Sequence, residues 1–348
     1  MNRVPQDELA RRVVRWQKSH GRNHLPWQNT QDPYRVWLSE IMLQQTQVVT
    51  VLDYYSRFLK RFPDVASLAK ASLDEVLGLW SGLGYYSRAR NLHACAREVV
   101  AVHGGAFPAT AVALQTLPGI GRSTAGAIAA LCFNERVAIL DGNVKRVLTR
   151  VLGFDADLAV ASHERALWQK AEELLPTRDL NSNMQPYTQG MMDLGATLCQ
   201  AKKPLCHTCP LSQQCIARQL GSPEKYPVKT RKLKRSSQSL WMLWVQTADA
   251  TVYLQQRPTP GVWAGLYCFL LFDSRAELEA AVPARQRPKL EDGVVFTHVL
   301  THKDLHLHTV RLTAPASAMA ELEGSWFRPA QWPQLGLPAP VRKLLSAG

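Results

Sequence analysis

The chain has 348 residues, of which 46% are hydrophobic, and this length and composition suit two packed domains and exclude a largely disordered protein. Its apolar runs are too short to cross a bilayer and its start does not fit a secretory signal peptide, so we expect a cytoplasmic protein without a membrane partner. The formal net charge is +13; residues 1–235 carry 31 Lys/Arg against 19 Asp/Glu, and residues 236–348 carry 10 against 9. Positive charge concentrated in the first region is typical of a protein that binds a polyanionic backbone.

Apolar residues recur at helical spacing through the first region of the chain, for example at Trp37, Ile41, Val48 and Leu52. Glycine and proline interrupt this pattern at short intervals, and strand-like alternation is nearly absent. We therefore expect residues 1–221 to form an all-α domain of about ten short helices.

The segment LQTLPGIGRSTA, at residues 114–125, predicts a short helix, a tight turn and a second helix. Leu117 precedes the turn, Gly119 and Gly121 shape it, and Ser123 lies in the second helix. The two glycines allow backbone amides to approach a phosphate at the N-terminus of that helix. This pattern predicts a helix-hairpin-helix that holds a DNA strand without reading its sequence.

Asp141 directly precedes another predicted helix, whose first turn contains Asn143. An aspartate at this position can face DNA held by the hairpin, or it can simply cap the helix. Taken alone, this segment favours the helix cap.

Four cysteines form a cluster in the sequence, with intervening segments of six, two and five residues: Cys199, Cys206, Cys209 and Cys215. Thiolates this close can converge on one metal centre. Only one closely spaced pair is present, whereas structural zinc usually uses two, so the spacing favours a [4Fe–4S] cluster and leaves zinc as the alternative. A disulfide framework fits least, because the remaining cysteines are solitary in apolar surroundings.

Residues 222–238 are polar and basic, and we expect them to form a linker that either tethers two domains or grips phosphates. Beyond them, short apolar runs predict strands at Leu240–Val245, Val252–Leu254, Tyr267–Phe272 and Leu305–Leu312. Helices are expected at Glu277–Val282 and Val341–Leu345. Residues 239–348 should therefore form a smaller α+β domain.

The hairpin, Asp141 and the cysteine loop, in this order, resemble the helix-hairpin-helix DNA glycosylases that carry an iron–sulfur cluster and are related to endonuclease III. The segments WLSEIMLQQTQV (37–48) and GLGYYSRAR (82–90), with a linked C-terminal domain, narrow the resemblance to the MutY-type adenine DNA glycosylases. It covers nearly the whole chain, most strongly residues 25–220. It implies a monomeric enzyme that hydrolyses the N-glycosidic bond of adenine mispaired with 8-oxoguanine or guanine in double-stranded DNA.

The resemblance implies that Glu40 protonates the leaving adenine and that Asp141 stabilises positive charge on the deoxyribose, as paired carboxylates do in glycoside hydrolysis. Glycosylases that also nick DNA carry a lysine at the position of Ser123, so a monofunctional enzyme is expected. The alternative is an endonuclease III-like glycosylase with lyase activity, for which Lys145 is nearby in sequence. A rival from another class is a non-catalytic, cluster-containing DNA-binding protein, in which both carboxylates are incidental.

Further contacts with DNA follow from the same resemblance. Gln45 and Tyr85 are expected to wedge into the duplex when adenine is turned out of the stack. Trp27, Gln28 and Gln189 are expected to lie about the adenine pocket.

The C-terminal domain resembles the Nudix (MutT) fold but lacks the acidic helix motif that binds Mg²⁺ in Nudix hydrolases. Phe296, Thr297 and His298 match a Phe-Ser/Thr-His loop that contacts 8-oxoguanine in the family. The resemblance therefore implies recognition of the lesion without hydrolysis by this domain.

Overall fold

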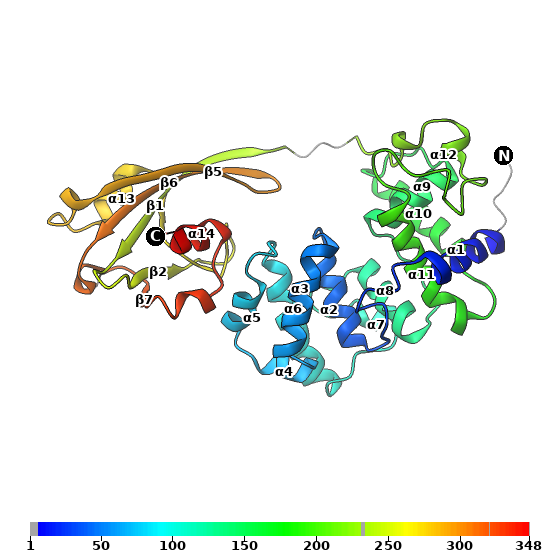
Figure 1. Ribbon diagram of the computed structural model, residues 1–348, viewed down its shortest axis with the longest axis horizontal. Helices are drawn as coiled ribbons and strands as arrows, with labels where there is room; N and C mark the ends of the chain where they lie inside the picture. Colours follow the sequence, from blue (N-terminus) through cyan, green and yellow to red (C-terminus); the bar gives the residue numbers. More distant parts are fainter. Residues whose placement is uncertain (1–5, 231–233, 320, 348) are drawn as a thin grey trace. The chain divides into compact units, whose positions relative to one another are not determined.

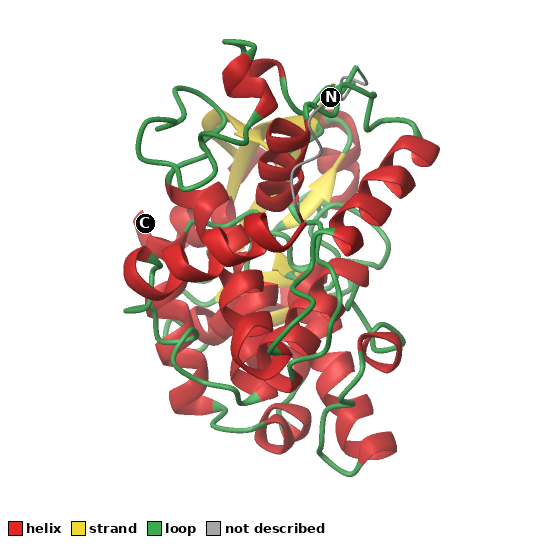
Figure 2. Ribbon diagram, turned by 90° about the vertical axis from the view of Figure 1, so that its right-hand side faces the viewer, coloured by secondary structure: helices red, strands yellow, loops and turns green. Residues whose placement is uncertain are grey.

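The structure is a computed structural model that describes residues 6–230, 234–319 and 321–347. The chain forms two compact units. The first comprises Met1–Val51, Phe62–Ala69 and Ala94–Lys232, and the second comprises Leu52–Arg61, Lys70–His93 and Leu233–Gly348. Helices dominate the chain, and the strands gather in one sheet (Figure 2).

Within the described residues, every regular element of the first unit is helical, as expected for residues 1–221. Its elements are α1 (Gln6–His20), α2 (Pro33–Leu43), α4 (Val65–Lys70), α7 (Ala111–Leu114), α8 (Arg122–Phe133), α9 (Gly142–Leu152), α10 (Ala161–Glu173), α11 (Leu180–Thr197), α12 (Ile216–Gln219) and the 3₁₀ turn η1 (Pro223–Lys225). Two further helices, α3 (Val48–Arg61) and α6 (Ser87–His103), contribute residues to both units.

Helix α11 is the central packing element of the first unit, and it lies against α1, α8 and α9 (Figure 1). Its contact with α9 requires a glycine. A Cβ atom added to Gly195 would lie 2.5 Å from the Cβ atom of Asn143, closer than two carbon atoms can pack. This close approach holds the N-terminus of α9 against α11.

The second unit contains α5 (Leu73–Trp80) and a seven-stranded sheet with the order β3-β2-β1-β6-β5, to which β4 adds on β1 and β7 on β2. Strands β1 and β6 are parallel, and β5 and β6 form an antiparallel hairpin. The strands are β1 (Ser236–Gln246), β2 (Val252–Gln256), β3 (Tyr267–Cys268), β4 (Leu270–Phe272), β5 (Glu291–Val299), β6 (Lys303–Thr313) and β7 (Ser325–Phe327).

Alternating apolar residues bury both faces of this sheet, as expected for strands that lie between helices. One core contains Leu240, Met242 and Trp244 together with Val341 of α14 (Ala339–Ala347). The other contains Leu243 and Val245 with residues of α13 (Arg275–Ala281). Short 3₁₀ turns complete the unit at η2 (Arg287–Lys289), η3 (Ala316–Met319) and η4 (Trp332–Gln334).

The predicted strands and helices of the C-terminal region are confirmed, with two corrections. The run Tyr267–Phe272 is divided, because β3 pairs with β2 whereas β4 pairs with β1. Strand β1 already begins at Ser236, so the last residues of the expected linker belong to the sheet. Arg231 and Lys232, which contribute to its basic character, lie outside the described residues. In the part of the chain that is described, no helix has the length and hydrophobicity that crossing a bilayer requires.

Candidate functional site

Glu40 projects from α2, a helix whose start is well determined by its sequence. Asp32 caps the helix by accepting a hydrogen bond from the backbone N–H of Tyr34 at 2.9 Å, and Pro33 occupies its first turn. Trp37 and Ile41 on the same helix are buried, which anchors it in the core. Glu40 is itself only partly exposed, so its carboxyl group lies at the edge of an apolar core.

Asp141 caps α9, and its carboxylate accepts a hydrogen bond from the backbone N–H of Val144 at 2.7 Å. The cap that the sequence suggested is therefore confirmed, and it does not remove Asp141 from the site. The preceding residue, Leu140, donates its backbone N–H to the Ser123 hydroxyl at 3.1 Å. This bond joins the segment that carries Asp141 to the second helix of the hairpin.

Asp141 lies close enough to Glu40 for its charge to act on the Glu40 carboxyl group, so the two residues belong to one site. Burial, and after it the negative charge of Asp141, raise the pKa of Glu40 to about 7 against the opposing effect of Arg22. Burial also raises the pKa of Asp141, while hydrogen bonds from the backbone N–H groups of Val144 and Asn143 oppose this shift. Near neutral pH, Glu40 can therefore hold a proton.

The predicted hairpin is formed by α7 and α8. Gly119 adopts a left-handed conformation with φ 76°, which a residue with a side chain rarely tolerates, and Leu117 is buried beneath the turn. Gly121 is the N-cap of α8 and provides no capping side chain. The first backbone N–H groups of α8 are thus left for an external acceptor such as phosphate.

Ser123 and Lys145 occupy defined positions near Asp141. The hydroxyl of Ser123 accepts the bond from Leu140 described above, and its side chain carries no amine. Lys145, in the first turn of α9, forms an ion pair with Glu164. Asn143 accepts a hydrogen bond from Arg146 at 2.8 Å through its side-chain oxygen.

Trp27, Gln28 and Gln189 come together, as expected, in the lining of one cavity of about 280 Å³. Val36 of α2 and Leu131 of α8 contribute apolar walls. Such a mixture of an aromatic ring, aliphatic groups and amides suits a small planar ligand.

Sequence reasoning missed Asp193, which lies below this cavity on α11. It is fully buried and accepts hydrogen bonds from the side-chain amides of Gln28 and Gln189, each at 3.2 Å, and from Arg22 at 2.7 Å. Its position between apolar residues, Met191 and Met192 before it and Leu194 after it, was the signal in the sequence.

Gln45 and Tyr85, the expected wedge residues, share an unusual backbone conformation. Their φ angles are 56° and 46°, in the left-handed region that residues other than glycine rarely occupy. Both side chains are exposed. Strained backbone of this kind concentrates at functional sites, where it presents a side chain that regular structure would turn inward.

The segment Phe296–His298 lies on strand β5, whereas the sequence analysis expected a loop. Phe296 packs against the core, and the Thr297 hydroxyl lies 3.0 Å from Nδ1 of His306 on β6. His298 lies beside Trp263, with ring centroids 5.9 Å apart, and burial lowers its pKa.

The turn that follows β5 contains Thr301, which no sequence motif indicated. The hydroxyl of Thr301 lies 2.5 Å from the hydroxyl of Tyr85, within the second unit. Both residues line a cavity of about 580 Å³, together with His298 and Trp263. The hairpin of β5 and β6 thus meets the segment that carries one expected wedge residue.

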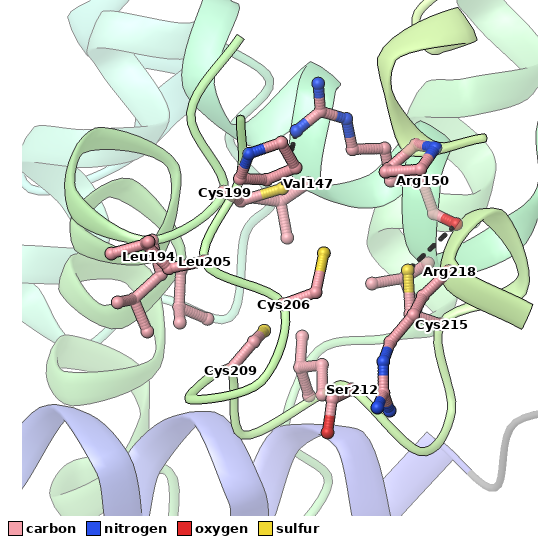
Figure 3. A pocket seen from close by; sticks show the side chains of 15 residues that line it. Val147, Arg150, Leu194, Cys199, Leu205, Cys206, Cys209, Ser212, Cys215 and Arg218 are labelled. Atoms are coloured by element: carbon pink, nitrogen blue, oxygen red, sulfur yellow. Dashed lines mark hydrogen bonds between the residues drawn. The ribbon is translucent and has the colours of Figure 1, made fainter. Parts of the chain in front are cut away.

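The four clustered cysteines line one pocket of the first unit, and their side chains surround a common space (Figure 3). Nowhere in the described chain do three His, Cys, Asp or Glu side chains converge tightly enough to hold a single metal ion. Burial, together with the neighbouring cysteines, raises the pKa of Cys209 to about 11. Four thiolates can coexist here only with a positively charged group between them.

Two arginines of α9 attach the cysteine loop to that helix. Arg150 is buried and has no carboxylate partner among the described residues, and it donates to the Cys199 sulfur at 3.3 Å and to the Gln200 carbonyl at 2.7 Å. Arg146 donates to the carbonyl oxygen of Cys199 at 2.7 Å. The helix that begins at Asp141 is therefore held along its length by the cysteine loop.

Comparisons with known proteins agree with this geometry. A family model described as HhH-GPD superfamily base excision DNA repair protein matches residues 38–174, and a NUDIX domain model matches residues 241–347. The adenine DNA glycosylase of Buchnera aphidicola subsp. Acyrthosiphon pisum is 37% identical over 341 residues, covering 96% of this chain and 95% of that protein. The adenine DNA glycosylase of Homo sapiens is 35% identical over 371 residues, covering 90% of this chain and 66% of its own length.

Solved structures show the same fold for the helical part. A thermostable thymine-DNA glycosylase matches with a TM-score of 0.54 and 28% identity, covering 62% of this chain and 97% of that one. An endonuclease III in a non-covalent complex with DNA matches with a TM-score of 0.50 and 19% identity, covering 63% of this chain and 98% of its own. The helical domain, the Nudix-like domain and the full-length similarity confirm the resemblance seen in the sequence, and the chain belongs to the adenine DNA glycosylases, DNA-binding enzymes of base excision repair that hydrolyse the N-glycosidic bond.

Proposed function

We propose that this enzyme removes adenine paired with 8-oxoguanine or guanine in double-stranded DNA, acting as a monomer with Glu40 as general acid and Asp141 as the ionised partner. Excision is assigned to residues 1–221 and reading of the opposite purine to residues 239–348. The observation that carries the proposal is the pair Glu40 and Asp141, in which the pKa of Glu40 is raised to about 7.

The chemistry follows from the different environments of the two carboxylates. Neutral adenine is a poor leaving group, and a proton delivered by Glu40 to N7 lets the electrons of the glycosidic bond depart with the base. The deoxyribose then carries positive charge, which the Asp141 carboxylate stabilises. Glu40, now ionised, helps to position the water whose oxygen bonds to the sugar carbon, leaving an abasic site.

The contacts of Ser123 and Lys145 favour hydrolysis over strand cleavage. A lyase needs a free amine to attack the sugar and form a Schiff base. Ser123 has no amine, and Lys145 is engaged with Glu164. No observation favours the endonuclease III-like alternative with lyase activity.

Contacts to DNA are assigned to three groups of residues. The N-terminus of α8, with Leu117, Gly119 and Gly121 in the turn before it, suits a phosphate of the backbone. Gln45 and Tyr85 are the wedge residues, and the cavity lined by Trp27, Gln28 and Gln189 receives the adenine. Asn143 is assigned a further contact with DNA, beside Asp141.

We assign recognition of the opposite purine to the hairpin of β5 and β6, which includes Phe296, Thr297 and His298. Within this hairpin Thr301 has the position best suited to contact DNA, because its hydroxyl lies in the cavity beside Tyr85. The Thr297 hydroxyl is engaged with His306.

The pocket formed by Cys199, Cys206, Cys209 and Cys215 suits a [4Fe–4S] cluster. The thiols surround a space without converging as a single ion requires, which supports a polynuclear centre over zinc. When bound, the cluster supplies four iron–thiolate bonds that hold the loop together. No step of the hydrolysis is assigned to it.

The rate of adenine release should fall as pH rises through about 7, because Glu40, with its raised pKa, loses the proton that it must donate. The loss should approach about tenfold per pH unit above that point. At acidic pH the rate should fall again as Asp141 is protonated, and at a higher pH than for an ordinary aspartate, because its pKa is also raised. Single-turnover rates measured from about pH 5 to pH 9 test both limbs. The Glu40→Gln variant should be slow and lack the basic limb; a wild-type rate that does not change above neutral pH speaks against Glu40 as the acid.

Adenine should be released faster opposite 8-oxoguanine or guanine than opposite thymine or cytosine.

Thr301→Val should reduce the advantage of 8-oxoguanine over guanine by about fivefold or more, because one hydrogen bond is lost. Thr297→Val, the matched control, should change it less, since Thr301 lines the cavity beside Tyr85 and Thr297 does not. Single-turnover rates on the four duplexes decide the matter. A larger loss in Thr297→Val than in Thr301→Val would assign the contact to Thr297. Equal rates on all four duplexes contradict the proposed specificity.

Purified enzyme should be yellow-brown and contain about four iron and four sulfide ions per chain. Elemental analysis and the visible absorption spectrum measure this directly. Cys206→Ser should lower the iron content and the folded yield, whereas Cys95→Ser, at a solitary buried cysteine, should leave the iron content unchanged. Active, colourless protein with stoichiometric zinc shows that the metal assignment is wrong.

A further inference from the structure

Asp193 is a fully buried carboxylate that no step above uses. One of its oxygens accepts the backbone N–H of Arg22 at 3.0 Å, and the other accepts the Arg22 guanidinium at 2.7 Å. The second oxygen also accepts the Nε2 atoms of Gln28 and Gln189, each at 3.2 Å. The ion pair with Arg22 compensates for the burial of this carboxylate.

An ionised carboxylate can only accept hydrogen bonds, and this determines how both glutamine amides are oriented. Each amide must direct its NH₂ group at Asp193 and turn its carbonyl oxygen away. For Gln28, that oxygen is buried and has no hydrogen-bond partner among the described residues. A buried acceptor without a donor is unfavourable, so this atom is suited to a donor on a bound ligand.

Gln28 and Gln189 line the cavity beside Trp27, whereas Asp193 does not. We propose that Asp193 is a positioning residue that makes the base pocket present hydrogen-bond acceptors, and that the pocket thereby selects a purine with an amino group at C6 over one with a carbonyl there. This inference rests on the proposed adenine pocket. The amino group of adenine donates to a glutamine oxygen, whereas the C6 oxygen of hypoxanthine meets that acceptor unfavourably.

The test compares single-turnover release of adenine and of hypoxanthine, each opposite guanine, by the same preparation of full-length enzyme. The ratio of the two rates does not depend on the active fraction. In Asp193→Asn the new amide offers one acceptor and one donor, so one glutamine can turn its NH₂ group toward the base. The ratio of adenine to hypoxanthine release should fall by about tenfold or more. A variant that slows both bases equally gives Asp193 a structural role only and overturns the inference.

Asp193→Glu is the conservative variant, because it keeps a group that only accepts. It should retain the preference for adenine even if both rates are lower. Should Asp193→Asn fail to fold, this variant keeps the inference open to refutation, because a ratio lost in Asp193→Glu overturns it.

Gln28→Met and Gln189→Met separate this inference from the pocket on which it rests. Methionine is about as long as glutamine but lacks the amide oxygen that accepts hydrogen bonds. If the cavity binds the base, each variant should lower the ratio of adenine to hypoxanthine release. If neither changes the ratio, the pocket assignment itself fails. If they lower the ratio but Asp193→Asn does not, the pocket stands and the role of Asp193 falls.

Discussion

The placement of α9 is the constraint on which the active site depends. Asp141 caps the helix at its start, and the bond between Leu140 and Ser123 joins that start to the hairpin of α7 and α8. Farther along, Arg146 and Arg150 attach the helix to the cysteine loop, while the close contact at Gly195 packs it against α11. Asp141, the proposed catalytic aspartate, is thus held by the same helix to which the hairpin and the cysteine loop are attached. Loss of the cysteine loop should therefore disturb Asp141, although the loop itself takes no part in the chemistry.

Arg22 connects the acid to the proposed base pocket. Its charge opposes the rise in the pKa of Glu40, and its guanidinium pairs with Asp193, which orients the glutamines of the cavity. Burial remains the larger effect on Glu40, so the carboxyl group keeps its proton near neutral pH. In the proposed mechanism, one cation, Arg22, therefore acts both on the proton donor Glu40 and on the residue that orients the base pocket, Asp193.

The sequence predicts those features that depend on local pattern. The all-α region, the turn at Gly119 and the cap at Asp141 follow from helical spacing and from residue preferences at turns and helix ends. Asp193 and Thr301 could not be predicted, because their partners Gln28 and Tyr85 lie 165 and 216 residues away in the chain. The resemblance at Phe296–His298 predicted the residue types but not their conformation. Pairing with β6 places these residues in a strand, because β5 extends to Val299.

The claim that Asp141 acts through its charge, and not only as a helix cap, is tested most directly by Asp141→Asn. The asparagine oxygen can still accept the backbone N–H of Val144, so the cap and the fold should survive while the charge is lost. Single-turnover release of adenine opposite 8-oxoguanine should fall by about 100-fold or more, with affinity for the duplex nearly unchanged. A variant that releases adenine within a few-fold of the wild-type rate contradicts the account.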